Sequence, residues 1–432
     1  MIKRILYTLL IMFPVLASAQ INTDRVMAIG RNALYFEDYV LSIQYFNQVI
    51  NAKPYLSDPY FYRGLAKINL DDFQGAESDC SEAIERNPFV VSAYQVRGLA
   101  RIQQNNFAGA IEDYTKALEF DPENIGVWHN MALCRIRQED YKGAKNDLDK
   151  LIAISPRYTK AYLMRGEVDL KQKDTLAAEK DFGKAIEIDR YDADTWASRA
   201  ILRLQQQRYK DAEADFDHAI RLSTRNSGVY INRALARYHQ NNLRGAMSDY
   251  DIALDIDPNN FIGHYNRGLL RAQVGDDNRA IQDFNFVIEM EPDNMMAIFN
   301  RGLLLDQTGD YKGAIKDYST VINEYPNFLL GYQYRAQARR KIGDVKGADA
   351  DEFKVLKAQL DKQNGVDPNK QTADNTENNK TRKKSDKNMN NYRKIVVADN
   401  EEGEEKYKSD YRGRVQDKNA VSYTHLRAHE TS

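Results

Sequence analysis

Apolar and small residues recur at fixed positions with a 34-residue period along most of this 432-residue chain. Within each period, two stretches carry apolar side chains at the three- and four-residue spacing that is typical of a helix. Polar or glycine-containing pairs, such as Asn105–Asn106 and Gly309–Asp310, separate the two stretches. Each period therefore predicts two helices joined by a short turn.

A recurrent proline sets the frame of these periods. Pro54, Pro88, Pro122 and Pro156 follow one another at this same interval. Because proline cannot continue a helix and restricts the residue before it, it ends the second helix of the period. When this proline is counted as the thirty-second residue, ten consecutive repeats run from residue 23 to 362 without insertion or deletion.

Two positions of each repeat hold small residues. The eighth position is Gly or Ala in all ten repeats, and the twentieth is Ala in nine and Ser42 in the first. Small residues let the two helices approach closely, while large rings at the fourth position, such as Tyr60 and Trp128, fill the wider gaps. Since a single hairpin cannot bury its apolar faces, we expect the repeats to stack into an all-α solenoid.

The order of aromatic, small, alanine, aromatic and proline positions at period 34 resembles the tetratricopeptide repeat (TPR) family. The resemblance covers residues 23–362 and implies a right-handed α-solenoid of ten helix-turn-helix repeats that binds other proteins. The chain departs from the family pattern at the seventh and eleventh positions, where arginine often stands in place of Leu and Tyr.

The resemblance also implies a concave groove lined by the first helix of each repeat. The fifth and ninth positions lie one turn apart on this helix and are mostly apolar, so they form a stripe. We expect a peptide or helix of a partner protein to bind there; the alternative is that neighbouring first helices bury the stripe against one another. The predicted groove residues are Phe61, Leu65, Leu163, Ile201, Ile231, Leu235, Tyr238, Tyr265, Leu269, Phe299 and Leu303. The Lys and Asn of the carboxylate clamp that some family members use are missing from the fifth and ninth positions.

Eight repeats have arginine at the seventh position, and at the N-terminal end of the chain this arginine varies together with aspartate at the twenty-third position. Nine repeats have the aspartate, and the first repeat lacks both residues, with Ile29 and Tyr45 in their places. We predict a structural ladder of ion pairs between stacked helices, formed either within a repeat or with the preceding repeat. The alternative is that arginines at positions seven and eleven, which share one helix face, bind an anion. The ladder residues that we single out are Arg199, Arg233, Arg267, Asp215, Asp249 and Asp283.

The composition of the chain gives little indication of catalytic or ligand-binding chemistry. The 61 Lys and Arg residues nearly balance 63 Asp and Glu residues, which argues against a nucleic-acid partner. The sequence has no glycine-rich phosphate loop and no nucleophile motif, and the spaced pair His425 and His429 lies in a C-terminal stretch that we exclude below. We therefore expect no catalytic residue, no metal and no cofactor, and free buried thiols at Cys80 and Cys134.

The N-terminal stretch 1–19 has the features of a secretory signal peptide. Lys3 and Arg4 precede an apolar stretch at 5–16 and an Ala-Ser-Ala cleavage site at 17–19. The apolar stretch is too short for a stable membrane span, and no later window is apolar enough. We expect an exported protein that is periplasmic or outer-membrane associated in a Gram-negative bacterium.

The chain after the repeats has a different composition. Residues 363–391 are polar and predict a disordered linker. Residues 392–420 regain some β-like character, and we expect them to open a C-terminal region that is truncated here. Residues 421–432 follow abruptly, and we interpret them as a non-native scar.

These features favour a non-catalytic scaffold of the cell envelope that binds a segment of a partner protein in the solenoid groove. Two alternatives stay open. One is an adaptor that binds peptidoglycan or another glycan through exposed rings such as Tyr265 and Phe299. The other is the repeat module of an enzyme whose catalytic domain lies beyond residue 420.

Overall fold

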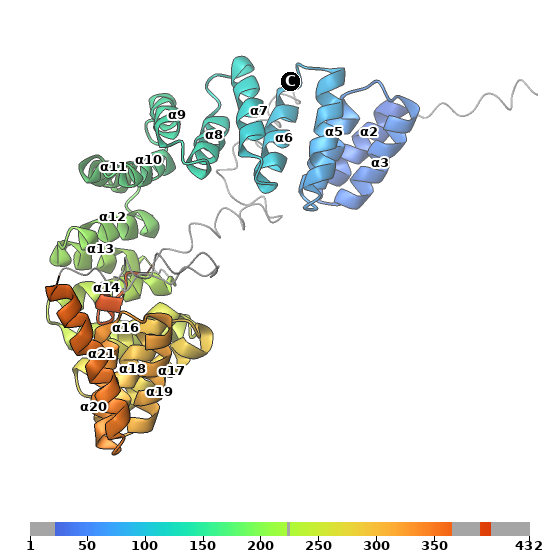
Figure 1. The fold of residues 1–432 in the computed structure, drawn as a ribbon. Coiled ribbons are helices and arrows are strands. Elements are labelled where there is room, and N and C mark those ends of the chain that lie inside the picture. The colour runs from blue at the N-terminus through green and yellow to red at the C-terminus, as the bar shows by residue number, and fades with distance from the viewer. Residues whose placement is uncertain (1–21, 223–224, 365–388, 399–432) are drawn as a thin grey trace, which may run out of the picture. The chain divides into compact units, whose positions relative to one another are not determined.

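The computed structural model describes residues 22–222, 225–364 and 389–398. This part of the chain forms twenty α-helices and one 3-10 helix, and none of the described residues forms a β-strand (Figure 1). The prediction of an all-α solenoid of helical hairpins is therefore confirmed. The helices fall into two compact units, divided between Arg190 and Tyr191.

The first unit contains the hairpins of repeats 1 to 5, with helices of 11 to 14 residues. Consecutive helices pair within each repeat and then stack on the next repeat. Its helices are α2 (Thr23–Tyr35), α3 (Tyr39–Ala52), α4 (Asp58–Ile68), α5 (Phe73–Arg86), α6 (Val91–Gln103), α7 (Phe107–Phe120), α8 (Ile125–Arg137), α9 (Tyr141–Ile154), α10 (Thr159–Lys171) and α11 (Thr175–Ile188).

The second unit contains the hairpins of repeats 6 to 10, stacked in the same way. Its helices are α12 (Ala193–Gln205), α13 (Tyr209–Arg221), α14 (Ser227–His239), α15 (Leu243–Ile256), α16 (Phe261–Gln273), α17 (Asp277–Met290), α18 (Met295–Thr308), α19 (Tyr311–Glu324), α20 (Leu329–Lys341) and α21 (Val345–Gln363), followed by the 3-10 helix η1 (Met389–Asn391).

The turn inside each hairpin has the same backbone conformation in all ten repeats. The fifteenth residue is left-handed, with φ of 59° to 64° where it is not glycine, and it is glycine in the last three repeats. The next residue usually caps the second helix; the Asp140 carboxylate, for example, accepts a hydrogen bond from the Gly143 N–H at 3.0 Å. These two positions fix where the second helix begins.

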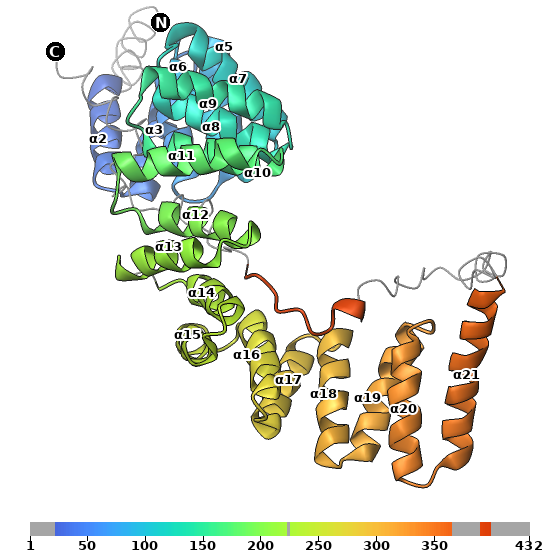
Figure 2. The same cartoon turned by 90° about the vertical axis from the view of Figure 1, so that its left-hand side faces the viewer.

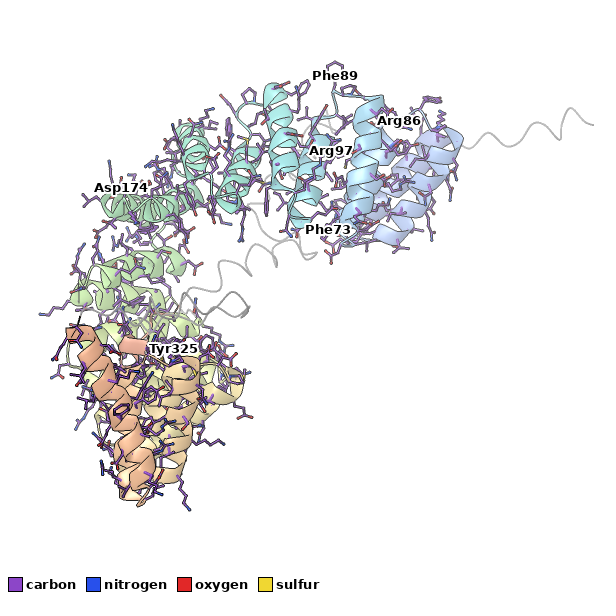
Figure 3. All side chains as sticks on the ribbon, in the orientation of Figure 1. Phe73, Arg86, Phe89, Arg97, Asp174 and Tyr325 are labelled. Atoms are coloured by element: carbon purple, nitrogen blue, oxygen red, sulfur yellow. The ribbon has the colours of Figure 1, made fainter. Side chains whose placement is uncertain are left out.

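Small residues and large rings alternate in the core of each unit. Alanine at the twentieth position is fully buried in all nine repeats that have it. A Cβ added to Gly98 would lie 2.7 Å from the Tyr114 ring, so the eighth position must be small where this ring packs. Figure 3 shows how the side chains fill the space between the helices; Tyr325 is buried, whereas Phe89 projects from the turn before α6.

Residues 389–398, here called the docked segment, lie along the first helices of the second unit. Figure 2 shows them as a red trace beside α14, α16 and α18. The docked segment includes the last three residues of the expected linker and the first seven of the expected C-terminal region. The expected signal peptide, residues 365–388 of the linker, residues 399–420 and the 421–432 stretch with His425 and His429 lie outside the described residues.

Candidate functional site

The arginine at the seventh position binds the aspartate at the twenty-third position of its own repeat. Arg199 Nε donates to Asp215 Oδ2 at 2.8 Å, and Arg199 Nη2 donates to Asp215 Oδ1 at 2.9 Å. Such a bidentate, charge-assisted pair fixes the geometry of both side chains. The same two-nitrogen pairing joins Arg233 to Asp249 and Arg267 to Asp283.

The third nitrogen of the same arginine reaches the preceding repeat. Arg233 Nη1 donates to Asp217 Oδ1 at 2.7 Å, and Arg267 Nη1 donates to Asp251 Oδ1 at 2.9 Å. The sequence left open whether the arginines pair within a repeat or with the preceding one, and the structure has both contacts at once. Arg233 and Arg267 therefore each join the two helices of their own hairpin and also bind the preceding hairpin.

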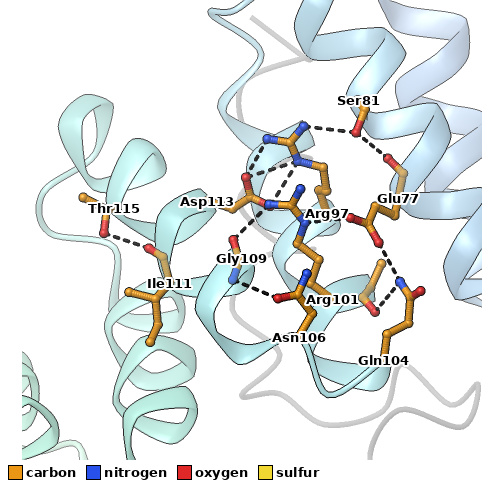
Figure 4. A network of polar contacts seen from close by, with 11 residues as sticks. Glu77, Ser81, Arg97, Arg101, Gln104, Asn106, Gly109, Ile111, Asp113 and Thr115 are labelled. Atoms are coloured by element: carbon orange, nitrogen blue, oxygen red, sulfur yellow. Dashed lines mark hydrogen bonds and ion pairs between the residues drawn. The ribbon is translucent and has the colours of Figure 1, made fainter. Parts of the chain in front are cut away.

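The arginine at the eleventh position joins the same network. Figure 4 shows this in the first unit, where Arg101 Nη1 donates to Asp113 at 3.0 Å and Arg101 Nε donates to Glu77 of the preceding repeat at 2.8 Å. In the second unit Arg237 makes the same two contacts, with Asp249 and Glu213. Because protein carboxylates already engage these guanidinium groups, the arrangement supports the structural interpretation of the arginine stripes over an anion site.

Repeat 4 lacks one member of the ladder. Met131 stands at the position where eight of the other nine repeats have arginine, and Asp147 faces Arg135 with an Nε–Oδ2 distance of 2.7 Å. Burial raises the pKa of Asp147 to about 6, and Arg135 opposes that rise. At Asp283, burial also raises the pKa, but hydrogen bonds from His264 and from the ladder arginine outweigh it, so the pKa lies below its ordinary value.

A row of three asparagines at the sixth position of repeats 7 to 9 contacts the docked segment. We call Asn232 on α14, Asn266 on α16 and Asn300 on α18 the asparagine row. Asn232 Nδ2 donates to the Ala398 carbonyl at 2.9 Å, and Asn232 Oδ1 accepts from the Ala398 N–H at 2.8 Å. Asn266 binds the carbonyl and N–H of Val396 in the same way, at 2.7 and 2.8 Å.

The third asparagine shares its contact with a tyrosine. Asn300 Nδ2 donates to the Tyr392 carbonyl at 2.6 Å, and the Tyr265 hydroxyl donates to the same oxygen at 2.6 Å. Asn300 also donates to the Met296 carbonyl of its own helix at 2.9 Å, which orients the amide. These hydrogen bonds from the asparagines and Tyr265 go to main-chain atoms of the docked segment, so they recognise an extended backbone and no particular side chain.

The asparagine row is buried in the second unit. Asn232 and Asn266 are 0% exposed and Asn300 is 5% exposed. A buried amide without hydrogen-bond partners costs roughly 1–3 kcal/mol, so an apolar side chain would be the more stable choice at a position that bound nothing. The row therefore forms a site whose chemistry fits the N–H and C=O groups of an extended chain.

Apolar side chains of the docked segment fill the spaces between these bonds. Met389, Ile395 and Ala398 are buried in the apolar clusters of the second unit. The Tyr392 ring meets the Phe299 ring edge to face, with centroids 4.8 Å apart. Val396 faces outward and is 42% exposed. The segment thus combines main-chain bonds with buried apolar anchors.

The predicted groove residues of the second unit come together around the docked segment. Tyr265 binds it through its hydroxyl, as described above. The predicted residues that share an apolar cluster with the docked segment are Ile201, Ile231, Leu235, Tyr238, Leu269, Phe299 and Leu303. Several of them are also buried against neighbouring helices. The same apolar stripe therefore packs the first helices together and contacts the docked segment.

The predicted groove residues of the first unit have different surroundings. Phe61 and Leu65 are buried in one cluster with Val96 and Leu99 of the next first helix. This is the mutual packing of first helices that we weighed as the alternative to partner binding. Leu163 is half-buried.

The asparagine row, which provides most of the polar contacts to the docked segment, is not among the residues predicted from the sequence. The signal was present, because Asn232, Asn266 and Asn300 occupy one position of three consecutive repeats. A polar residue that recurs on the inward face of a helix among apolar neighbours indicates a hydrogen-bonding role.

The described residues offer no further chemical site beyond the ladder and the asparagine row. Within them, no group of three or more His, Cys, Asp and Glu side chains is placed to hold a metal ion. None of the described helices has the length and apolar character needed to cross a membrane. Cys80 and Cys134 are free and buried, which confirms the prediction for the thiols, and burial raises the pKa of both.

Stacked hairpins with a 34-residue period and a peptide segment along their first helices define a helical-repeat protein of the protein-binding class. A family model described as TPR repeat matches residues 98–134. Models described as tetratricopeptide repeat match residues 125–158, 159–192, 198–261 and 265–327. The chain therefore belongs to the tetratricopeptide repeat family, whose members bind other proteins or peptides and generally act as non-catalytic scaffolds.

Several solved structures are similar to this chain. One is a tetratricopeptide repeat protein from Parabacteroides merdae ATCC 43184, with 21% identity, a TM-score of 0.46, and coverage of 58% of this chain and 98% of that one. Another is pilF of Pseudomonas aeruginosa, with 20% identity, a TM-score of 0.41, and coverage of 47% and 92%. A third is YrrB, described as a TPR protein with an unusual peptide-binding site, with 20% identity, a TM-score of 0.36, and coverage of 43% and 95%. No curated protein matches the chain.

Proposed function

We propose that the second unit binds extended segments of partner proteins through the asparagine row. The observation that carries this proposal is the pair of two-way hydrogen bonds by which Asn232 and Asn266 hold the N–H and C=O of Ala398 and Val396. Main-chain bonds supply affinity for any extended peptide, and apolar pockets for alternate side chains supply selectivity. The protein is a scaffold that presents this groove.

The geometry favours an extended segment over a helix as the occupant. A helix uses its interior N–H and C=O groups in internal hydrogen bonds, so only its ends leave backbone groups free, and no residue in its interior can offer both to the asparagine row. An extended chain leaves both groups of a residue available, as Val396 does. This narrows the expectation from the sequence, which admitted either a peptide or a helix.

The glycan alternative depended on exposed rings at Tyr265 and Phe299. In the described structure these side chains are 4% and 0% exposed. Neither ring is available to stack on a sugar while the docked segment is in place. The alternative in which the repeats serve a catalytic domain concerns residues beyond 420, which lie outside the described part of the chain.

Peptide display on the purified full chain tests the proposed binding. Ten-residue peptides that are enriched should carry apolar side chains at the spacing of Tyr392, Ile395 and Ala398. Their binding should weaken at least tenfold in Asn266→Ala, because two hydrogen bonds to the peptide backbone are lost. Asn130→Ala is the matched control, since Asn130 has the same position in a repeat of the first unit. Peptides that bind the Asn266→Ala chain as well as the original would contradict the proposal.

We also propose that the protein is exported and works in the cell envelope, in the periplasm or at the outer membrane. The basic start, the apolar stretch and the Ala-Ser-Ala site within residues 1–19 support this location. Cell fractionation with N-terminal sequencing should find a periplasmic protein that begins at Gln20. A chain that keeps this N-terminal stretch and stays in the cytoplasm would rule out export.

A further inference from the structure

The second unit contains both a peptide-binding groove and a peptide that fills it. The docked segment contacts three consecutive first helices, and its main-chain partners are 92 to 166 residues away in the sequence. Met389, Ile395 and Ala398 are the buried anchors on its inward side. An external peptide of the same kind would need the same asparagines and the same pockets.

The docked segment is attached in a way that allows exchange. Residues 392–398 form no regular secondary structure, and Asn391, Arg393, Lys394 and Val396 are exposed. Its apolar contacts come from Met389, Tyr392, Ile395, Val397 and Ala398, and its hydrogen bonds to the repeats come from three of its residues. A tethered ligand of this kind competes through an effective concentration set by its tether. The groove is then available to another peptide only in the fraction of molecules whose segment has left.

We propose that residues 389–398 are a built-in competitor that occupies the groove until a partner segment displaces it. The inference rests on the proposed peptide-binding function. The partner segment has the chemistry of the competitor: an extended stretch with an aromatic residue, an apolar residue three positions later and a small residue three positions after that, as in Tyr392, Ile395 and Ala398. Residues that face outward between these anchors are free to vary.

Two substitutions weaken the competitor without touching the groove. Val396→Pro removes the N–H that Asn266 accepts, while the exposed side chain at this position contributes little packing. Ile395→Asp places a charge in a buried apolar pocket. Val396→Ala keeps the N–H and is the matched control. Each variant is made in the full chain.

The experiment measures binding of a fluorescent ten-residue peptide with the sequence of residues 389–398, by anisotropy. Val396→Pro and Ile395→Asp should bind the peptide at least tenfold more tightly than the original chain, and Val396→Ala should bind it like the original. Adding Asn266→Ala to Val396→Pro should remove the gain. This pattern would establish competition for one site.

Three other outcomes would overturn the proposal. If Asn266→Ala weakens peptide binding but Val396→Pro and Ile395→Asp do not strengthen it, the groove binds peptides and the segment is no competitor. If no variant binds this peptide and display enriches none, the proposed peptide-binding function fails as well. If the original chain forms a concentration-dependent dimer that Val396→Pro dissociates, the segment binds a second copy of the chain instead of its own groove.

Discussion

At the scale of single residues, the aspartates of the twenty-third position differ in the number of arginines that face them. Asp249 is 1% exposed and binds both Arg233 and Arg237, whereas Asp147 faces Arg135 with Met131 in the place of a second arginine. A buried ion pair stabilises a fold only when its desolvation is offset by good geometry and further hydrogen bonds. The two aspartates should therefore respond in opposite ways to neutralisation.

Asp249→Ala should lower the free energy of unfolding by about 3 kcal/mol, because it leaves two guanidinium groups without their buried partner. Chemical denaturation followed by circular dichroism measures this loss. Asp255→Ala is the matched control, since Asp255 lies on the exposed side of the same helix, and its effect should stay within about 0.5 kcal/mol. A loss below about 1 kcal/mol for Asp249→Ala would contradict the structural ladder.

Asp147→Asn should raise the free energy of unfolding at pH 7.5 by about 1 kcal/mol, since it removes a carboxylate that burial penalises. The pKa of Asp147 in the folded chain is about 6, above its ordinary value of 3.8. The folded state therefore holds the proton more tightly, and the stability that protonation provides is lost as pH rises through about 6. The advantage of the variant should thus disappear in denaturation experiments at pH 4. An equal gain at both pH values would contradict this explanation.

At the scale of elements, each hairpin depends on one left-handed residue in its turn. The last three repeats use glycine there, and Gly275 has a φ of 82°. A Cβ added to Gly275 would meet no atom within 4 Å, so a substitution changes the strain of the backbone conformation without changing the packing. The hairpin is thus set by a local conformational preference, which explains why it could be predicted from a polar or glycine-containing pair.

Gly275→Ala should lower the free energy of unfolding by about 1 kcal/mol, because a left-handed conformation is strained for a residue with a Cβ. Thermal and chemical denaturation of the full chain measure the change. Gly275→Asn should cost less, since asparagine tolerates this conformation better and already occupies the same position at Asn241. Equal losses for both variants would point to an effect other than backbone strain.

At the scale of the whole molecule, one short segment contacts several repeats. Among the docked residues, the N–H groups of Val396 and Ala398 are bonded to asparagine side chains of α16 and α14. Such contacts link consecutive hairpins through a segment that is distant from them in the sequence. The docked segment keeps its conformation only while it is bound to the groove. The groove residues, in turn, are shielded from solvent only while the segment covers them.

Amide hydrogen exchange should reveal this mutual dependence. The N–H groups of Val396 and Ala398 should exchange at least tenfold more slowly than that of Arg393, because their hydrogen bonds must open first. Asn266→Ala should remove most of the protection at Val396. Fragmentation mass spectrometry with single-residue resolution makes the measurement. Uniform fast exchange from 392 to 398 would contradict the docked arrangement.

Much of the fold could be predicted from the sequence, because the interactions that determine it are local. The turn glycines, the prolines that end helices and the small residues such as Gly98 act within one repeat or between adjacent repeats. A 34-residue period repeats most of these local preferences along the chain, so the fold class and the hairpins could be predicted. The covariation of arginine with aspartate likewise predicted the ladder, although not that one arginine bonds two repeats at once.

The occupant of the groove became known only from the folded chain. The residues that hold the docked segment are up to 166 positions away from it, and no periodicity links the two. The bonds go to N–H and C=O groups, which almost every residue has, so the segment needed no recognisable motif. The repeats and the apolar stripe could be predicted from the residues alone, because they depend on side-chain type at fixed spacing. The pairing of groove and segment depends on main-chain atoms that the fold brings together. Since these atoms are the same in almost every residue, the pairing could not be predicted from the sequence.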